Sequence, residues 1–175
     1  MKIIEHIKQL LINRVPHWNL TLFLIFLVFL TALLVLLKKS RINTNQKTAS
    51  ALLLFYSYNV LITTLFMRKP MTYRIFNFTP LSSFVTPHDS SMLEFLFNAL
   101  LFIPIGFLIN CIFKKFKPGK TVLIGMTSSL IIEIIQFALR LGEFETDDII
   151  SNTLGAFSGS LIYLLIVYLK NKNKK

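Results

Sequence analysis

The 175-residue sequence has little of what disulfides, metal sites and soluble surfaces require. Cys111 is its one cysteine, so no disulfide can form within the chain. Three scattered histidines and the absence of a Cys-x-x-Cys motif leave no ligand set for a structural metal ion, and we expect no cofactor. Charged residues make up 15% of the chain, against about 25% in soluble domains, which excludes an ordinary soluble protein.

Apolar residues dominate what is present. Hydrophobic residues account for 54% of the chain, 17 of them are phenylalanines, and the mean hydropathy is +0.63. The formal net charge of +11 would suggest nucleic acid in a soluble protein, but here the cations cluster at the ends of apolar runs. The charge therefore indicates membrane topology and contact with anionic lipids, and we expect membrane lipids and no nucleic acid as partners.

Five apolar stretches are long enough to cross a membrane, since about 20 residues at roughly 1.5 Å each span a hydrocarbon core of about 30 Å. They are residues 20–37, 49–67, 93–113, 121–141 and 149–169. The sequence thus predicts an all-α integral membrane protein with a bundle of about five transmembrane helices. No small-residue cleavage site follows the first stretch, so we expect it to stay in the mature protein.

The first 18 residues carry a different pattern from the predicted spans. Residues 1–18 have apolar residues at helical spacing, as in an amphipathic helix lying in the headgroup plane, and the alternative is a frayed terminus. We divide the chain into this segment with the first span (1–48), a transmembrane domain (49–169) and a basic tail (170–175).

Lysine and arginine counts predict the orientation of the bundle. Segments 38–48, 114–120 and 170–175 carry four each. The connections on the other side carry seven in all, counting Arg140. The positive-inside rule therefore places the C-terminus in the cytoplasm of a multi-pass cell-membrane protein, and 68–92 and 142–148 outside.

Glu133 is the least expected residue in the predicted spans. It lies about 12 Å from the outer end of its helix, where an ionisable group costs about 2.5 kcal/mol or more and marks function by default. Ser129, Gln136 and Arg140 share its helical face, at i−4, i+3 and i+7 from Glu133. This alignment predicts a polar stripe that faces protein or water.

The neighbouring spans carry matching stripes near their outer ends. Glu94 and Asn98 are one turn apart on the third span, and the fifth has Asp148, Asn152, Gly155 and Gly159 on one face. The two glycines predict close helix packing, and Pro104 with Gly106 predicts a kink in the third span. We therefore predict an outward polar pocket, with Arg74 and Asn77 in its lid, lined by Glu94, Asn98, Glu133, Gln136, Arg140, Asp148 and Asn152.

Structural roles are the alternative for each of these residues. Amides and hydroxyls in membrane helices commonly bond neighbouring helices, and Glu133 could be a buried acid paired with Arg140. Asp147 and Asp148 suit the N-terminus of a helix, whose dipole favours negative charge. Arg74 is of the type that anchors a protein in lipid headgroups.

Four motifs resemble the VanZ-like family in order and spacing. They are Asn-Phe-Thr-Pro-Leu at 77–81, Asn-Ala-Leu-Leu-Phe-Ile-Pro-Ile-Gly-Phe at 98–107, Ser-Leu-Ile-Ile-Glu-Ile-Ile-Gln at 129–136 and Asp-Ile-Ile-Ser-Asn-Thr-Leu-Gly-Ala at 148–156. The resemblance covers about residues 73–163. It implies a small bacterial membrane protein with a four-helix core and a role in low-level resistance to the glycopeptide teicoplanin, with no firmly attached reaction.

One stretch departs from the family pattern. Many members have Arg-x-x-Asp-Ile-Asp-Asp before the last helix, whereas residues 143–148 read Glu-Phe-Glu-Thr-Asp-Asp. The terminal acid and Asn152 are retained, but a role assigned to the missing arginine does not carry over.

Three functions follow as hypotheses. The resemblance implies a resistance protein at the outer face of the membrane, binding a lipoglycopeptide or a lipid-linked cell-wall precursor. The second is a membrane enzyme acting on lipid or cell-wall intermediates, with Glu133 as base and Arg140 holding a phosphate; no His-Glu-x-x-His or Gly-x-Ser-x-Gly motif supports it. The third is a transporter or an accessory subunit that docks through the face carrying Gly155 and Gly159. Its partner would be a second copy of the chain or another membrane protein.

Overall fold

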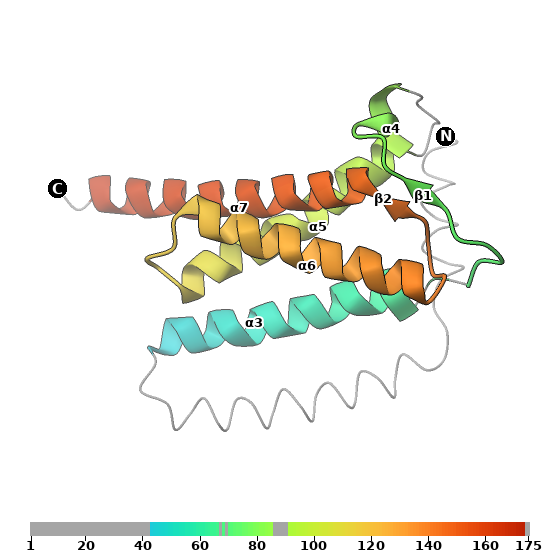
Figure 1. Cartoon of the computed structure of the whole chain (residues 1–175). Coiled ribbons are helices and arrows are strands. Elements are labelled where there is room, and N and C mark those ends of the chain that lie inside the picture. The colour runs from blue at the N-terminus through green and yellow to red at the C-terminus, as the bar shows by residue number, and fades with distance from the viewer. Residues whose placement is uncertain (1–42, 67, 69, 86–90, 174–175) are drawn as a thin grey trace, which may run out of the picture.

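Four long helices form a bundle in the part of the chain that the structure describes. The computed structural model describes residues 43–66, 68, 70–85 and 91–173. The helices are α3 (Thr44–Leu61), continued by the π-helical turn η1 (Ile62–Phe66), α5 (Ser91–Ile112), α6 (Pro118–Ala138) and α7 (Thr146–Lys172) (Figure 1). All four are long and apolar enough to cross a membrane, which confirms an all-α membrane protein. The expected amphipathic segment 1–18 and first span 20–37 lie outside the described residues.

The helix ends follow local sequence signals. The Ser-x-x-Glu pattern at 91–94 coincides with the start of α5, and Pro118 stands in the first turn of α6, where its missing N–H is not needed. The expectation that α6 reaches residue 141 is wrong at its C-terminal end. The helix ends at Ala138, and Arg140 has a φ of 58°, which breaks the helical path.

Small residues bring α5 and α7 close together. A Cβ at Gly155 would overlap the backbone of Ala99, and one at Gly159 would overlap the carbonyl of Ile103. On the other helix, a Cβ at Gly106 would overlap the carbonyl of Ala156. The glycine face of α7 is therefore filled by α5 of the same chain, so this face is not free for a partner protein.

The core combines apolar and polar contacts. Phe102, Ile109 and Ile132 belong to one buried cluster with residues of α3 and α7. The Tyr56 hydroxyl of α3 donates to the Leu101 carbonyl of α5 at 3.0 Å. Pro104 follows three residues later and has no N–H to contribute to the hydrogen-bond ladder of α5. α5 continues through this proline to Ile112.

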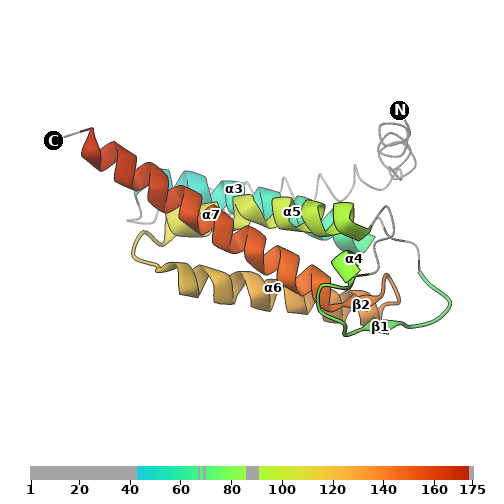
Figure 2. The same ribbon diagram turned by 90° about the horizontal axis from the view of Figure 1, so that it is seen from above.

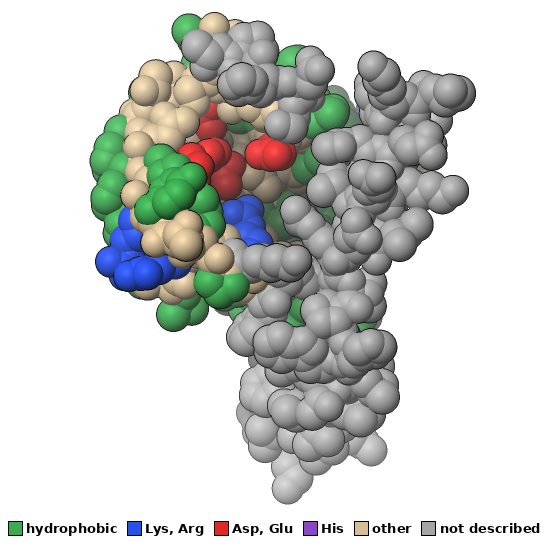
Figure 3. Space-filling model, turned by 90° about the vertical axis from the view of Figure 1, so that its right-hand side faces the viewer, with side chains coloured by type: hydrophobic (Ala, Val, Ile, Leu, Met, Phe, Trp, Pro, Cys, Tyr) green, Lys and Arg blue, Asp and Glu red, His purple; other side chains and the backbone are tan. Residues whose placement is uncertain are grey.

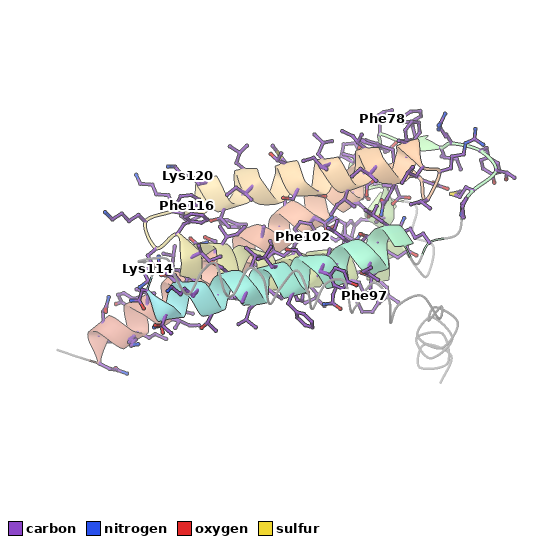
Figure 4. All side chains as sticks on the ribbon, turned by 90° about the horizontal axis from the view of Figure 1, so that it is seen from below. Phe78, Phe97, Phe102, Lys114, Phe116 and Lys120 are labelled. Carbon is purple, nitrogen blue, oxygen red and sulfur yellow. The ribbon has the colours of Figure 1, made fainter. Side chains whose placement is uncertain are left out.

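The two ends of the bundle differ in charge. The start of α3, the connection between α5 and α6 and the end of α7 lie at one end, which carries the described lysines (Figure 1). Lys114 and Lys120 flank Phe116 there, far from Phe78 at the other end (Figure 4). All described carboxylates are near that other end, which carries β1 (Phe76–Asn77), β2 (Phe144–Glu145) and α4 (Ser82–Val85).

The first turns of α7 meet the last turns of α6 beside β2, because α7 crosses the bundle obliquely (Figure 2). Asn152 donates to the Ser129 hydroxyl at 2.8 Å across this contact. The contact thereby brings Glu133 of α6 close to Asp148 in the first turn of α7.

Candidate functional site: an acidic pocket at one end of the bundle

A two-residue parallel ladder separates polar from aromatic side chains. Phe76 pairs with Phe144, and Asn77 pairs with Glu145. Since successive strand residues point to opposite faces, Phe76 and Phe144 share one face, while Asn77 and Glu145 share the other. The Thr146 hydroxyl donates to the Asn77 carbonyl at 3.3 Å and fixes the end of the ladder.

Asp147 holds α4 against the start of α7. Its carboxylate accepts hydrogen bonds from the Leu81 amide, the Ser82 hydroxyl (3.2 Å) and both the amide and the hydroxyl of Ser83 (2.9 and 2.7 Å). Leu81 has a φ of 58°, a strained backbone conformation for a leucine. One carboxylate thus folds the segment that follows β1 and places two serines beside the acidic turn.

A cavity of about 220 Å³ lies between these elements. Its lining consists of Asn77, Ser82, Ser83, Ser91, Glu94, Phe95, Glu143, Glu145 and Asp148. Figure 3 shows acidic side chains gathered in a hollow of this end of the molecule, with basic side chains next to them. Among the described residues, the lining offers four carboxylates, amide and hydroxyl groups and one aromatic ring, and no cation.

Asp148 links the pocket to the acid buried behind it. The Asn98 amide donates to Asp148 at 2.6 Å, and the Asp148 carboxyl contacts that of Glu133. Glu133 is 2% exposed and accepts a hydrogen bond from the Glu145 amide at 3.1 Å. The buried acid therefore orders β2 and Asp148, which in turn faces the pocket.

Arg68 supplies the positive charge of this cluster, and the sequence did not reveal it. It interacts favourably with the carboxylates of Glu133, Glu145 and Asp148. Its guanidinium occupies the place that a Cβ of Gly142 would need. Arg68 follows the second predicted span directly, so sequence reasoning treated it as a topology signal.

Glu145 has an unusual pKa for a carboxyl group outside the helices. Burial, followed by the charges of Asp148, Glu143 and Glu94, raises the pKa of Glu145 to about 7, although Arg68 acts in the opposite direction. Its charge therefore changes in the physiological pH range.

The pocket brings together part of the predicted set. Asn77, Glu94 and Asp148 line it, while Asn98 and Glu133 reach it through Asp148. Asn152 bonds α7 to α6 through Ser129 and is buried away from the lining.

Three predicted residues lie elsewhere. Gln136 donates to the Thr64 carbonyl at 2.9 Å and joins α6 to η1. Arg140 is exposed beyond the end of α6, because the helix that was expected to carry it stops at Ala138. Arg74 donates to the carbonyls of Phe137 and Ala138 at 3.4 and 3.2 Å, so it caps the C-terminus of α6.

The donor set favours binding of a cation or of hydrogen-bond donors. Within the described parts of the chain, no three histidine, cysteine or acidic side chains are arranged as metal ligands. The same parts contain no histidine that could pair with a serine as in a catalytic triad, and the Ser83 hydroxyl donates to Asp147.

Comparison with known proteins identifies relatives. The family model described as VanZ/LLP1 matches residues 20–167, so the match includes the expected first span. Protein VanZ of Enterococcus faecium is 32% identical over 114 residues, which are 64% of this chain and 71% of that protein. No solved structure matches the chain.

Proposed function

Because this chain belongs to the VanZ/LLP1 family, we propose that it lowers the susceptibility of its cell to teicoplanin-type glycopeptides by binding a ligand in the acidic pocket. The pocket lining is the observation that carries this proposal. Glu94, Glu143, Glu145 and Asp148 converge on one cavity, and Arg68 is the neighbouring cation. The excess of negative charge favours a ligand with an ammonium group.

The size of the cavity limits what enters it. A volume of about 220 Å³ is below the roughly 300–1,000 Å³ of pockets that enclose a drug-sized molecule. A glycopeptide would therefore place only a projecting amine or one residue in the pocket. A lipid headgroup or a cell-wall precursor would fit by the same chemistry only through an ammonium group.

The pocket faces the outside in this proposal. The described lysines lie at the opposite end of the bundle, and the positive-inside rule assigns that end to the cytoplasm. Glycopeptides and exported cell-wall precursors meet at the outer face, where the pocket would be accessible to both.

Catalysis is the weaker alternative on this geometry. Glu133, the expected base, is 2% exposed and is separated from the cavity by Asp148. A reaction would have to use Asp148 or Glu145 as the proton acceptor. Turnover of a labelled lipid-linked precursor by the purified protein, lost in Asp148→Asn, would support an enzyme.

Complementation of a strain that lacks the gene tests binding in cells. We expect the wild-type chain to raise the minimal inhibitory concentration of teicoplanin, and the pocket variants Asp148→Asn and Glu145→Gln to lose most of this increase at unchanged membrane abundance. Lys117→Gln is the matched control, because it also removes one charge but lies at the opposite end of the bundle. Full resistance in both pocket variants would refute the proposal.

Calorimetry in nanodiscs tests the ligand class directly. The wild-type protein should bind teicoplanin more tightly than a derivative whose amines are acetylated. Equal affinity for the two, at normal protein folding, would exclude an ammonium group as the element recognised.

A further inference from the structure

Aromatic rings cover the face of the β1–β2 ladder that is opposite to the pocket. The ring centroid of Phe76 lies 5.4 Å from that of Phe78, 4.1 Å from that of Phe137 and 6.2 Å from that of Phe144. Phe76 and Phe78 are nevertheless 53% and 65% exposed. The rings support one another and leave a broad apolar surface open to the surroundings.

Arg74 borders these rings, and Arg140 follows Phe137 by three residues in the chain. The guanidinium of Arg74 lies 5.5 Å from the centre of the Phe137 ring, and two of its five N–H groups are used on helix carbonyls. Arg140 is exposed two residues after Ala138, and its own carbonyl accepts the Met71 amide at 2.7 Å. The remaining donors of both side chains are available to an anion, whereas the nearby carboxylates face the pocket.

The surface continues the apolar side of a membrane span. Ile131 and Ile134 of α6 are 51% and 52% exposed, and Leu139 just beyond the helix is 59% exposed. Phe137 stands between them and the ladder. A lipid-facing helix surface thus passes, at the end of the span, into aromatic and then basic side chains.

We propose that this aromatic–basic surface, formed by Arg74, Phe76, Phe78, Phe137, Arg140 and Phe144, lies in the headgroup layer and binds the phosphates of anionic phospholipids. Aromatic rings concentrate at the membrane–water interface, and guanidinium groups bind phosphate oxygens in pairs. Because the other face of the same ladder lines the pocket, lipid binding would hold the pocket mouth at headgroup depth. This inference does not require that the pocket bind a glycopeptide.

A tryptophan reporter tests the position of the surface. Trp18, the one native tryptophan, is replaced by phenylalanine, and Phe78→Trp is introduced at the most exposed ring. In nanodiscs, we expect quenching by lipids brominated near the headgroup to exceed quenching by lipids brominated near the chain end. Ile131→Trp, in the middle of α6, is the matched control and should show the reverse order.

Lipid selectivity tests the two arginines. With equal fractions of brominated phosphatidylglycerol and phosphatidylcholine, we expect the reporter in Phe78→Trp to sense a roughly fivefold enrichment of the anionic lipid for each basic residue at the surface. Arg74→Gln and Arg140→Gln should each remove about that factor. Arg74→Lys should keep only part of it, because the charge stays but the paired hydrogen bonds that a guanidinium gives to phosphate are lost.

Two results would overturn the inference. One is fluorescence of the Phe78→Trp reporter that no brominated lipid quenches. If that fluorescence changes only with the number of protein copies per nanodisc, a second copy of the chain covers the surface instead of lipid. The other is that anionic and zwitterionic lipids quench the reporter equally, in the protein that retains both arginines as well as in Arg74→Gln and Arg140→Gln.

Discussion

Removing the Asp147 carboxylate should release α4 from the bundle. In Asp147→Ala the Ser83 amide is left without an acceptor in a residue that is 7% exposed, which costs about 1–3 kcal/mol. The exposed Leu81 amide loses a charge-assisted hydrogen bond worth roughly 1.5–3 kcal/mol. The two losses together weaken the local structure by at least about 2.5 kcal/mol, before the serine hydroxyls are considered.

Hydrogen exchange measures this loss residue by residue. A change of about 2.5 kcal/mol corresponds to a roughly 70-fold decrease in protection, which we expect for the Phe84 and Val85 amides, both of which donate to the Leu81 carbonyl. Asp147→Asn is the matched control: it keeps one oxygen acceptor and should lose less. Protection of 84–85 within threefold of the wild type in Asp147→Ala would refute the anchoring role, as would an equal loss throughout α5.

Three further predictions concern charge, packing and the pocket. Raising the pH from 5 to 8 should lower thermal stability and strengthen binding of a cationic ligand, because the pKa of Glu145 is about 7 in the folded protein, above the ordinary value of 4.5 that it has when unfolded. Between pH 4.5 and about 7 the folded state holds a proton that the unfolded state has released, so stability falls as the pH rises through this range. Melting curves of Glu145→Gln should show a smaller fall in melting temperature over the same range. Gly155→Ala should cost about 1–3 kcal/mol and reduce membrane abundance on immunoblots, whereas Gly119→Ala, with open space around it, should be tolerated. Asn98→Ala should lower ligand affinity in calorimetry about tenfold through its lost 2.6 Å bond to Asp148, and unchanged affinity would remove it from the site.

The spans could be predicted because they depend on local composition. Apolar length, the flanking lysines and Pro118 place α5, α6 and α7 to within three residues at each end, whereas α3 begins at Thr44, five residues before the predicted span 49–67. The end of α6 was misplaced because the apolar residues continue beyond Ala138, while the left-handed conformation of Arg140 ends the helix. Hydropathy does not register such a change in backbone direction.

The site could be predicted only where a helical face carried it. Asn98 and Asp148 lie on stripes that were read from spacing, and the structure joins them. Glu145 reaches the pocket from a short ladder, and Arg68, which follows η1, comes close to the carboxylates beside it; both depend on packing between segments far apart in sequence. No periodic pattern in the sequence marks such residues. The acidic stretch 143–148, which contains no basic residue, was the one sequence feature that indicated a counterion from elsewhere in the chain.

Cysteine protection in intact cells tests the central claim, which is an outward pocket that holds a ligand. Ser91→Cys places a thiol in the lining at the start of α5, and Cys111→Ser removes the native thiol. We predict that a membrane-impermeant maleimide labels the introduced thiol from outside and that teicoplanin slows this labelling. Labelling only after permeabilisation, or at a rate that teicoplanin leaves unchanged, would contradict the account.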